Sequence, residues 1–293
     1  MVGLDIAGID LVAEDISQPL HAQGGAIVEV NAGPGLLMHL KPAIGVPRPV
    51  GQAIVSHLFE PQQPTRIPVV GIMGRTRTTD LAHLVNWLIH LSGRRTGLAS
   101  ARGLYMNQRL VDAKDARVFE ASQRLLINRA LDAAVFENTP LQVLDEGLPY
   151  DRCLVGVLTD MPDHTGLQDH DVQTPEQVRH VVRTQIDLVL PEGAAVLNAE
   201  DPALVDMAHL CGGEVIYHAY DANHPTIVSH LAQQGRAVVR QQNQVLLLNG
   251  PHSQALLDLD FPAIAKQLKD GVIHPDNLLA AVAVAWALAL SPD

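Results

Sequence analysis

Two acidic side chains and one amide near the start of the chain have the types and spacing to hold a hard cation. Asp10 lies in the alternating segment 8–12, and Glu29 and Asn31 lie in the apolar segment 26–31. Because side chains alternate along a strand, Glu29 and Asn31 share one face, and pairing of the two segments would bring Asp10 to them. Carboxylate and amide oxygens suit Mg²⁺, which keeps waters and nucleotide phosphates as its other ligands. The spacing alone also fits solvated residues on one sheet face.

A second group of residues follows the apolar segment 67–72, where a glycine turn leads into a helical pattern. Phosphate groups bind at such strand–turn–helix units, because the N–H groups at a helix N-terminus attract anions. The turn and the helix start comprise Gly74, Arg75, Thr76, Arg77, Thr78 and Thr79. The pattern fits a loop that binds nucleotide phosphates, and it equally fits an ordinary turn with solvated arginines.

The composition indicates an acidic protein with a sizeable hydrophobic core and with its cysteines in the reduced, thiol form. The 293 residues include 20 Lys and Arg against 32 Asp and Glu, so we expect no binding to nucleic acid or to an anionic membrane. Hydrophobic residues make up 47% of the chain. Cys153 and Cys211 stand far apart, which excludes a disulfide framework and a cysteine zinc site. Since neither a membrane-spanning run nor a signal peptide is evident, we expect a cytoplasmic protein.

The elements that must position these residues fall into two parts. We place a linker at 61–66, a β-rich segment at 1–60 and a larger unit at 67–293. In the larger unit, apolar segments of strand length alternate with helical patterns, which predicts a mainly parallel α/β sheet covered on both faces. The expected strands are 67–72, 133–136, 154–158, 194–197 and 215–218, the expected helices are 50–59, 81–91, 176–189, 202–210 and 277–290, and 238–248 is expected to be an antiparallel hairpin.

The amino-acid sequence of the first segment resembles that of a known family. The stretches GLDIAGIDLVAEDIS at 3–17 and GGAIVEVNAGPGL at 24–36 resemble the C-terminal end of an ATP-grasp domain, and more narrowly that of the cyanophycin synthetases. That family polymerises arginine and aspartate, or aspartyl-arginine dipeptides, through acyl phosphates. The resemblance implies that Asp10, Glu29 and Asn31 are Mg²⁺ ligands beside ATP.

The next domain of that family resembles a Mur ligase, whose phosphate-binding loop reads Gly-Thr-Asn-Gly-Lys-Thr. Without a gap, Gly74 matches the first glycine, Arg77 stands at the second and Thr78 stands at the lysine. With a gap, Arg75 stands at the lysine instead. In either register the lysine is lost, and in the ungapped one a side chain at the second glycine obstructs close approach of N–H groups to phosphate. The resemblance therefore implies a Mur ligase-like core with a degenerate P-loop.

The remaining matches to the Mur-like core are partial. Glu137 matches a metal-binding glutamate and His164 matches a histidine ligand, which together form a vestigial metal pair. Asn198 and Asp201 match a motif beside the adenine, and Asn277 matches the asparagine of the last core helix. At several positions, the phosphate-binding and metal-binding residues of the family are replaced, and the C-terminal lid domain is missing. This module is therefore not expected to catalyse ligation.

Two functions fit these observations. In the first, the chain is the C-terminal portion of a cyanophycin synthetase-like amide ligase that uses ATP and Mg²⁺. In the second, the larger unit is a non-catalytic scaffold or dimerisation module derived from a Mur ligase core. Residues 1–60 are too few for an ATP-grasp site, so the chain is expected to be a fragment, a split-gene product or a reading frame begun too late. The resemblance implies an upstream ATP-grasp body or a companion synthetase chain as partner, and we expect a homo-oligomer.

Overall fold

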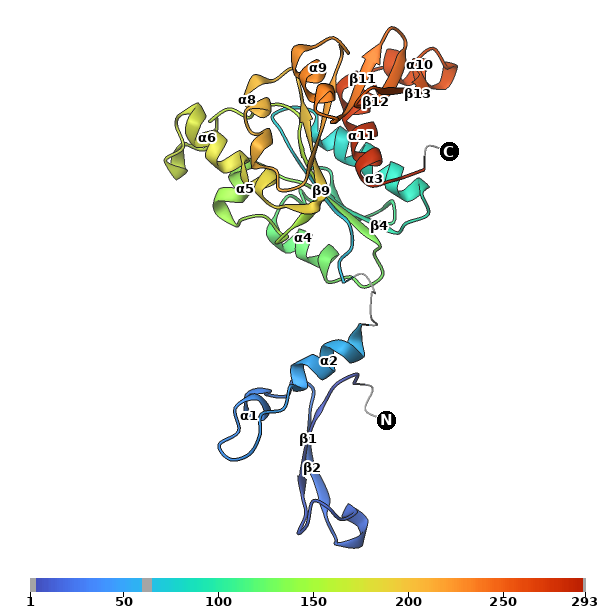
Figure 1. Cartoon of the computed structure of the whole chain (residues 1–293). Helices are drawn as coiled ribbons and strands as arrows, with labels where there is room; N and C mark the ends of the chain where they lie inside the picture. Colours follow the sequence, from blue (N-terminus) through green and yellow to red (C-terminus); the bar gives the residue numbers. More distant parts are fainter. Residues whose placement is uncertain (1–3, 60–64, 292–293) are drawn as a thin grey trace. The chain divides into compact units, whose positions relative to one another are not determined.

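The computed structural model describes residues 4–59 and 65–291, which form two compact units. Unit 1 is Met1–Arg66 and unit 2 is Ile67–Asp293 (Figure 1). Residues 61–64 of the predicted linker lie outside the described residues.

Unit 1 is built around an antiparallel hairpin, in which β1 (Gly8–Val12) pairs with β2 (Ala26–Asn31). Both strands have the predicted bounds. A 3₁₀ turn at Leu20–Ala22 lies between them, and the helices α1 (Leu37–Leu40) and α2 (Val50–Leu58) follow, the second close to the predicted 50–59. Two strands offer no second layer to bury their side chains, so apolar residues of the hairpin remain exposed.

Unit 2 contains an 11-stranded sheet with the order β13-β12-β11-β10-β9-β8-β3-β7-β4-β5-β6. The strands from β11 to β4 in that order pair in parallel, and antiparallel strands extend both ends. The predicted fold class, a mainly parallel α/β sheet, is confirmed. The bounds are β3 (Val69–Met73), β4 (Thr96–Ser100), β5 (Gly103–Met106), β6 (Arg109–Asp112), β7 (Ala133–Glu137), β8 (Cys153–Leu158), β9 (Val189–Asn198), β10 (Glu214–Ala219), β11 (Arg236–Gln241), β12 (Gln244–Asn249) and β13 (His252–Asp258).

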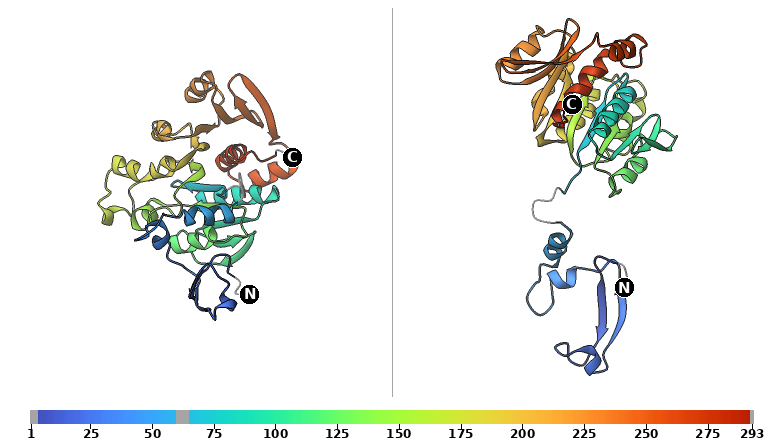
Figure 2. Two further views of the ribbon diagram at one scale, coloured as in Figure 1. Left: turned by 60° about the horizontal axis from the view of Figure 1, so that its bottom comes forward. Right: turned by 90° about the vertical axis from the view of Figure 1, so that its right-hand side faces the viewer.

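Helices cover both faces of this sheet. The helices α3 (Thr78–Leu91) and α11 (Pro275–Ala287) lie side by side on one face (Figure 2). Helices that pack into separate hydrophobic clusters cover the other face. These are α4 (Phe119–Leu126), α6 (Pro175–Val182), α7 (Thr184–Asp187), α8 (Pro202–Val205) and α9 (Pro225–Ala232). Partly buried residues of α5 (Pro140–Asp145) pack against the cluster of α6 to α9, and those of α10 (Pro262–Lys269) pack against the cluster of α3 and α11.

The central strands are apolar throughout because neighbouring side chains enter different cores. In β7, Val135 packs into the cluster of α3 and α11, and Phe136 packs into the cluster of α4 on the opposite face. Both side chains are fully buried. This two-sided burial is the reason for the continuous apolar runs in the sequence.

Two predicted helices are shorter than expected. The segment 176–189 contains α6 and α7, and Val189 already begins β9. The segment 202–210 contains α8 and a 3₁₀ turn at Ala208–Leu210. In both segments, the apolar residues at helical spacing belong to two consecutive short elements rather than to one long helix. Among the described residues, no helix combines the length and the apolar character needed to cross a membrane.

Three strand ends meet where the candidate site lies. β3 is flanked by β7 and β8, and all three run parallel, so their carboxyl ends share one edge of the sheet. Gly74 follows β3, Glu137 ends β7 and Thr159 follows β8. A Cβ on Gly74 would lie 2.0 Å from Thr159 Oγ1, so this close approach requires glycine. Open α/β sheets bind ligands at such an edge.

Candidate functional site

The hairpin of unit 1 brings the three predicted ligands of a cation together. Asp10 lies directly opposite Glu29 in the register of β1 and β2. Nδ2 of Asn31 donates a hydrogen bond to Oδ2 of Asp10 at 3.3 Å. Both carboxylates are exposed. Two carboxylates and one amide form a hard oxygen set that fits Mg²⁺ and leaves its other positions to waters or phosphates.

In unit 2, the turn between β3 and α3 holds a carboxylate from a neighbouring strand end. The main-chain N–H groups of Arg75 and Thr76 donate to Oδ1 of Asp160 at 3.0 and 3.4 Å, and Thr76 Oγ1 donates to Oδ2 at 3.1 Å. Thr159 Oγ1 also donates to Oδ1 at 2.7 Å. Nε of Arg75 lies 3.7 Å from Oδ2. The predicted phosphate-binding turn is thus bound to an internal carboxylate.

Arg77, the last residue before α3, has a backbone conformation that favours glycine. Its φ is 56° and its ψ is 15°, in the left-handed region. A glycine at this position would adopt the same conformation without the steric cost of a side chain, which is compatible with the ungapped register. The side-chain amide of Asn277 donates to the carbonyl of Arg77 at 3.1 Å, and Asp276 lies 3.7 Å from the Arg77 guanidinium.

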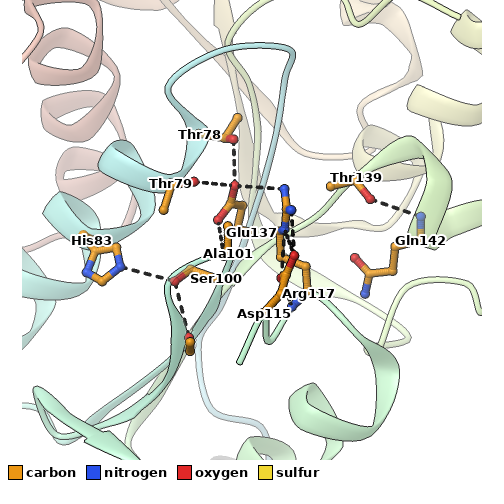
Figure 3. Close-up of polar contacts among 11 residues, drawn as sticks. Thr78, Thr79, His83, Ser100, Ala101, Asp115, Arg117, Glu137, Thr139 and Gln142 are labelled. Atoms are coloured by element: carbon orange, nitrogen blue, oxygen red, sulfur yellow. Dashed lines mark hydrogen bonds and ion pairs between the residues drawn. The ribbon is translucent and has the colours of Figure 1, made fainter. Parts of the chain in front are cut away.

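Glu137, the predicted metal ligand, is buried and receives several hydrogen bonds (Figure 3). The hydroxyls of Thr78 and Thr79 donate to its Oε1 at 2.9 and 2.8 Å, and the N–H of Ala101 donates to its Oε2 at 2.8 Å. The fourth partner is Arg117, whose Nη1 lies 3.6 Å from Oε1. Both threonines are therefore anchored to Glu137.

Arg117 is itself fixed by a second carboxylate. Its Nε and Nη2 donate to Oδ1 and Oδ2 of Asp115 at 3.0 and 2.8 Å, a bidentate pair. The pKa of Asp115 is lowered mainly by these hydrogen bonds, and the pKa of Arg117 is raised by Asp115 and, more weakly, by Glu137. The cation next to Glu137 is thus a guanidinium that two carboxylates hold in place.

The other predicted residues of the site lie apart from Glu137. His164 is exposed on the loop after β8, and no hydrogen bond or ion pair joins it to Glu137 in the described part of the chain. Asn198 ends β9, and its Oδ1 accepts from the N–H of Glu200 at 3.0 Å. Asp201 caps α8 and also accepts from the N–H of Met161 at 2.9 Å. Across 4–59 and 65–291, no group of three or more His, Cys, Asp or Glu side chains is arranged to hold a metal.

Sequence reasoning missed Asp160, Arg117 and Asp276. Asp160 lies two residues beyond the predicted strand 154–158, at the edge where the Gly74 turn was expected, so the meeting of parallel strand ends was a usable signal. Arg117 lies in the connection from β6 to α4, a stretch without a predicted element, and nothing in the sequence pointed to it. Asp276 precedes the predicted Asn277 at the start of α11.

Asn138, the residue after Glu137, connects the end of β7 to two other buried side chains. Nδ2 of Asn138 donates to the hydroxyl of Tyr150 at 2.7 Å and to Oε1 of Gln185 at 2.8 Å. All three side chains are buried. These bonds link the residue after β7 to two other buried side chains, while Oδ1 of Asn138 and Nε2 of Gln185 have no hydrogen-bond partner among the described residues.

Comparison with solved structures defines the class of the fold. A UDP-N-acetylmuramoyl-L-alanyl-D-glutamate–2,6-diaminopimelate ligase matches with a TM-score of 0.56 at 13% sequence identity, over 82% of this chain and 47% of that one. The chain therefore has the fold of a Mur ligase core, a likeness that at this identity concerns the fold alone. No protein-family model matches the sequence.

Curated relatives give a more specific answer. A cyanophycin synthetase of Synechocystis sp. (strain ATCC 27184 / PCC 6803 / Kazusa) is 36% identical over 251 residues, and that of Crocosphaera subtropica (strain ATCC 51142 / BH68) is 35% identical. The matches cover 85% of this chain but 28% and 29% of the relatives. The chain is thus similar in sequence to part of the cyanophycin synthetases and spans less than a third of the length of these relatives.

Proposed function

We propose that the chain forms part of an ATP-dependent amide ligase of the cyanophycin synthetase type, which polymerises aspartate and arginine or aspartyl-arginine units. The sequence identity of 32–36% to cyanophycin synthetases over 251 residues supports this assignment. The single observation that carries it in the structure is the grouping of Asp10, Glu29 and Asn31 on one hairpin.

Unit 1 supplies the C-terminal part of an ATP-grasp domain in this proposal. Its hairpin leaves large apolar side chains exposed, among them Ile9 at 53% and Val28 at 68%. Exposed apolar surface of this kind marks a face that another part of a protein covers. We infer that the remainder of an ATP-grasp body, on an upstream segment or on a companion synthetase chain, packs against it.

Asp10, Glu29 and Asn31 would hold Mg²⁺ in that domain. Bound there, Mg²⁺ would neutralise negative charge on the phosphates of ATP while an acyl phosphate forms. The chain's own contribution is to fix the oxygens. The strand register sets the two carboxylates opposite each other, and the amide of Asn31 orients Asp10 by its hydrogen bond.

Unit 2 serves as a non-catalytic scaffold in this proposal. In the ungapped register, a threonine stands where the family loop has its lysine, and Glu137 accepts a hydrogen bond from this threonine. Arg77 brings a side chain to the position of the second glycine. We propose that the unit stabilises a homo-oligomeric synthetase, which light scattering of the assembled protein would test.

The test of the proposed function uses this chain joined behind the ATP-grasp body of the Synechocystis relative. The assay is ATP-dependent incorporation of aspartyl-arginine, or of aspartate and arginine, into a primer. Glu29→Ala should lower the rate by about a thousandfold or more, because the lost charge stabilisation amounts to several kcal/mol. Glu137→Gln, the matched control in unit 2, should leave the rate nearly unchanged. Equal loss in both variants, with both proteins folded, would contradict the assignment of the active site to unit 1.

A further inference from the structure

The turn between β3 and α3 directs two consecutive main-chain N–H groups at one point. Those of Arg75 and Thr76 both donate to Oδ1 of Asp160, at 3.0 and 3.4 Å. Converging N–H groups at the start of a helix form a cradle for an anionic oxygen. Asp160 places an oxygen of the chain itself in that cradle.

Two side-chain donors of the turn face the same carboxylate. Thr76 Oγ1 donates to Oδ2 at 3.1 Å, and Nε of Arg75 lies 3.7 Å from that oxygen. The side chain of Asp160 is only 24% exposed. A phosphate group brought to this turn would therefore meet a negative charge that already holds its hydrogen-bond donors, and the two like charges would repel each other.

At the neighbouring end of β7, the chain places a cation of its own beside a buried carboxylate. The buried carboxylate of Glu137 has Arg117 at 3.6 Å, and Asp115 holds Arg117 by two hydrogen bonds at 3.0 and 2.8 Å. A divalent cation would have to displace a guanidinium that is fixed in this way. The hydroxyls of Thr78 and Thr79 already donate to the same Glu137 oxygen.

We infer that this edge of unit 2 is an oxyanion site occupied by the chain itself, with Asp160 in the place of a phosphate group and Arg117 in the place of a cation. Both side chains oppose the binding of Mg²⁺ and of a nucleotide phosphate at this edge. The inference rests on the proposed non-catalytic role of unit 2 and gives it a physical cause. Once Asp160 is removed, the cradle should accept a tetrahedral oxyanion such as inorganic phosphate.

The experiment measures thermal unfolding of the chain in inorganic phosphate and in chloride at matched ionic strength. In chloride, Asp160→Ala should lower the Tm by about 5 °C, because two N–H groups lose their acceptor. Phosphate should recover a good part of that loss. The wild type should show only the small general salt effect. Asp258→Ala is the matched control, since Asp258 is an exposed aspartate that accepts a main-chain N–H, from Asp260, in a turn after β13.

Asp160→Asn keeps an acceptor oxygen, removes the charge and decides the question if Asp160→Ala does not fold. It should lose less stability than Asp160→Ala and should still gain stabilisation by phosphate. An equal phosphate effect in the wild type, both Asp160 variants and Asp258→Ala would overturn the inference. Such a result would leave the ligation assay untouched, whereas Glu137→Gln abolishing ligation would defeat the proposed function whatever phosphate does.

Discussion

The side-chain amide of Asn277 donates to the main-chain carbonyl of Arg77 at 3.1 Å, across 200 residues of sequence. This bond ties the start of α11 to the residue that precedes α3, and the carboxylate of Asp276 reinforces it from 3.7 Å. The last helix of the chain thereby holds the turn in a left-handed conformation at Arg77.

That conformation predicts an unusual effect of substitution. Arg77→Gly should raise the free energy of unfolding by about 0.5 kcal/mol, because relief of the left-handed strain exceeds both the entropy of glycine in the unfolded chain and a half-exposed ion pair. Arg77→Ala removes the same ion pair but keeps the strain, so it should be destabilising. Urea unfolding of the two variants checks this, and equal destabilisation in both would show that the strain is negligible.

Glu137 and Arg117 should be energetically coupled. Glu137→Ala should cost about 3–5 kcal/mol, because it leaves Arg117 and several hydrogen-bond donors without their acceptor in a buried place. Arg117→Met should also be destabilising, since the carboxylate of Glu137 then loses its compensating charge. The double variant should cost less than the sum of the single ones, which a double-mutant cycle in denaturant measures. Additive costs would mean that the ion pair contributes little.

The sequence was sufficient for the parallel sheet because β3, β7, β8 and β10 are short apolar runs that both faces bury. It was insufficient for β4 to β6, whose turns at positive φ, such as Asn107, and polar edge residues break any period. The predicted helix 176–189 was too long because the helical spacing of apolar residues continues to the start of β9.

The candidate site could likewise be predicted from the sequence only in part. The local pattern located the Gly74 turn after a strand, and the family resemblance pointed to Glu137 at the end of another strand. The partners of these residues come from distant parts of the chain: Asp160 is 85 residues from Arg75 in sequence. Only the topology of the sheet brings such residues together, so spacing along the chain carries no record of the pairing.

Acid should weaken unit 2 through His218. Burial lowers the pKa of this histidine to about 4, against a smaller raising effect of Asp276. Because the unfolded chain binds the proton more readily, stability is full above about pH 6.5 and falls as the pH drops toward 4, by about 3 kcal/mol in all. Burial also lowers the pKa of His83 and His230, which acts in the same direction.

Urea unfolding between pH 7 and pH 4 measures this dependence. His218→Gln should flatten part of the profile, whereas His252→Gln, at an exposed position in β13, should leave it unchanged. A wild-type profile that is flat over this range would contradict the burial of a neutral His218.

The affinity for Mg²⁺ and ATP gives the last test of the degenerate loop. The chain should bind MgATP with a Kd above about 1 mM, corresponding to less than about 4 kcal/mol. Arg77→Gly with Thr78→Lys should increase the affinity, and the increase should be larger when Asp160→Ala is added, because the cradle is then free. Arg75→Lys, which restores a lysine in the gapped register, should have no such effect. Calorimetry decides between these outcomes. Micromolar binding by the wild type would show that the loop still accepts phosphate despite Asp160, and a gain with Arg75→Lys alone would favour the gapped register.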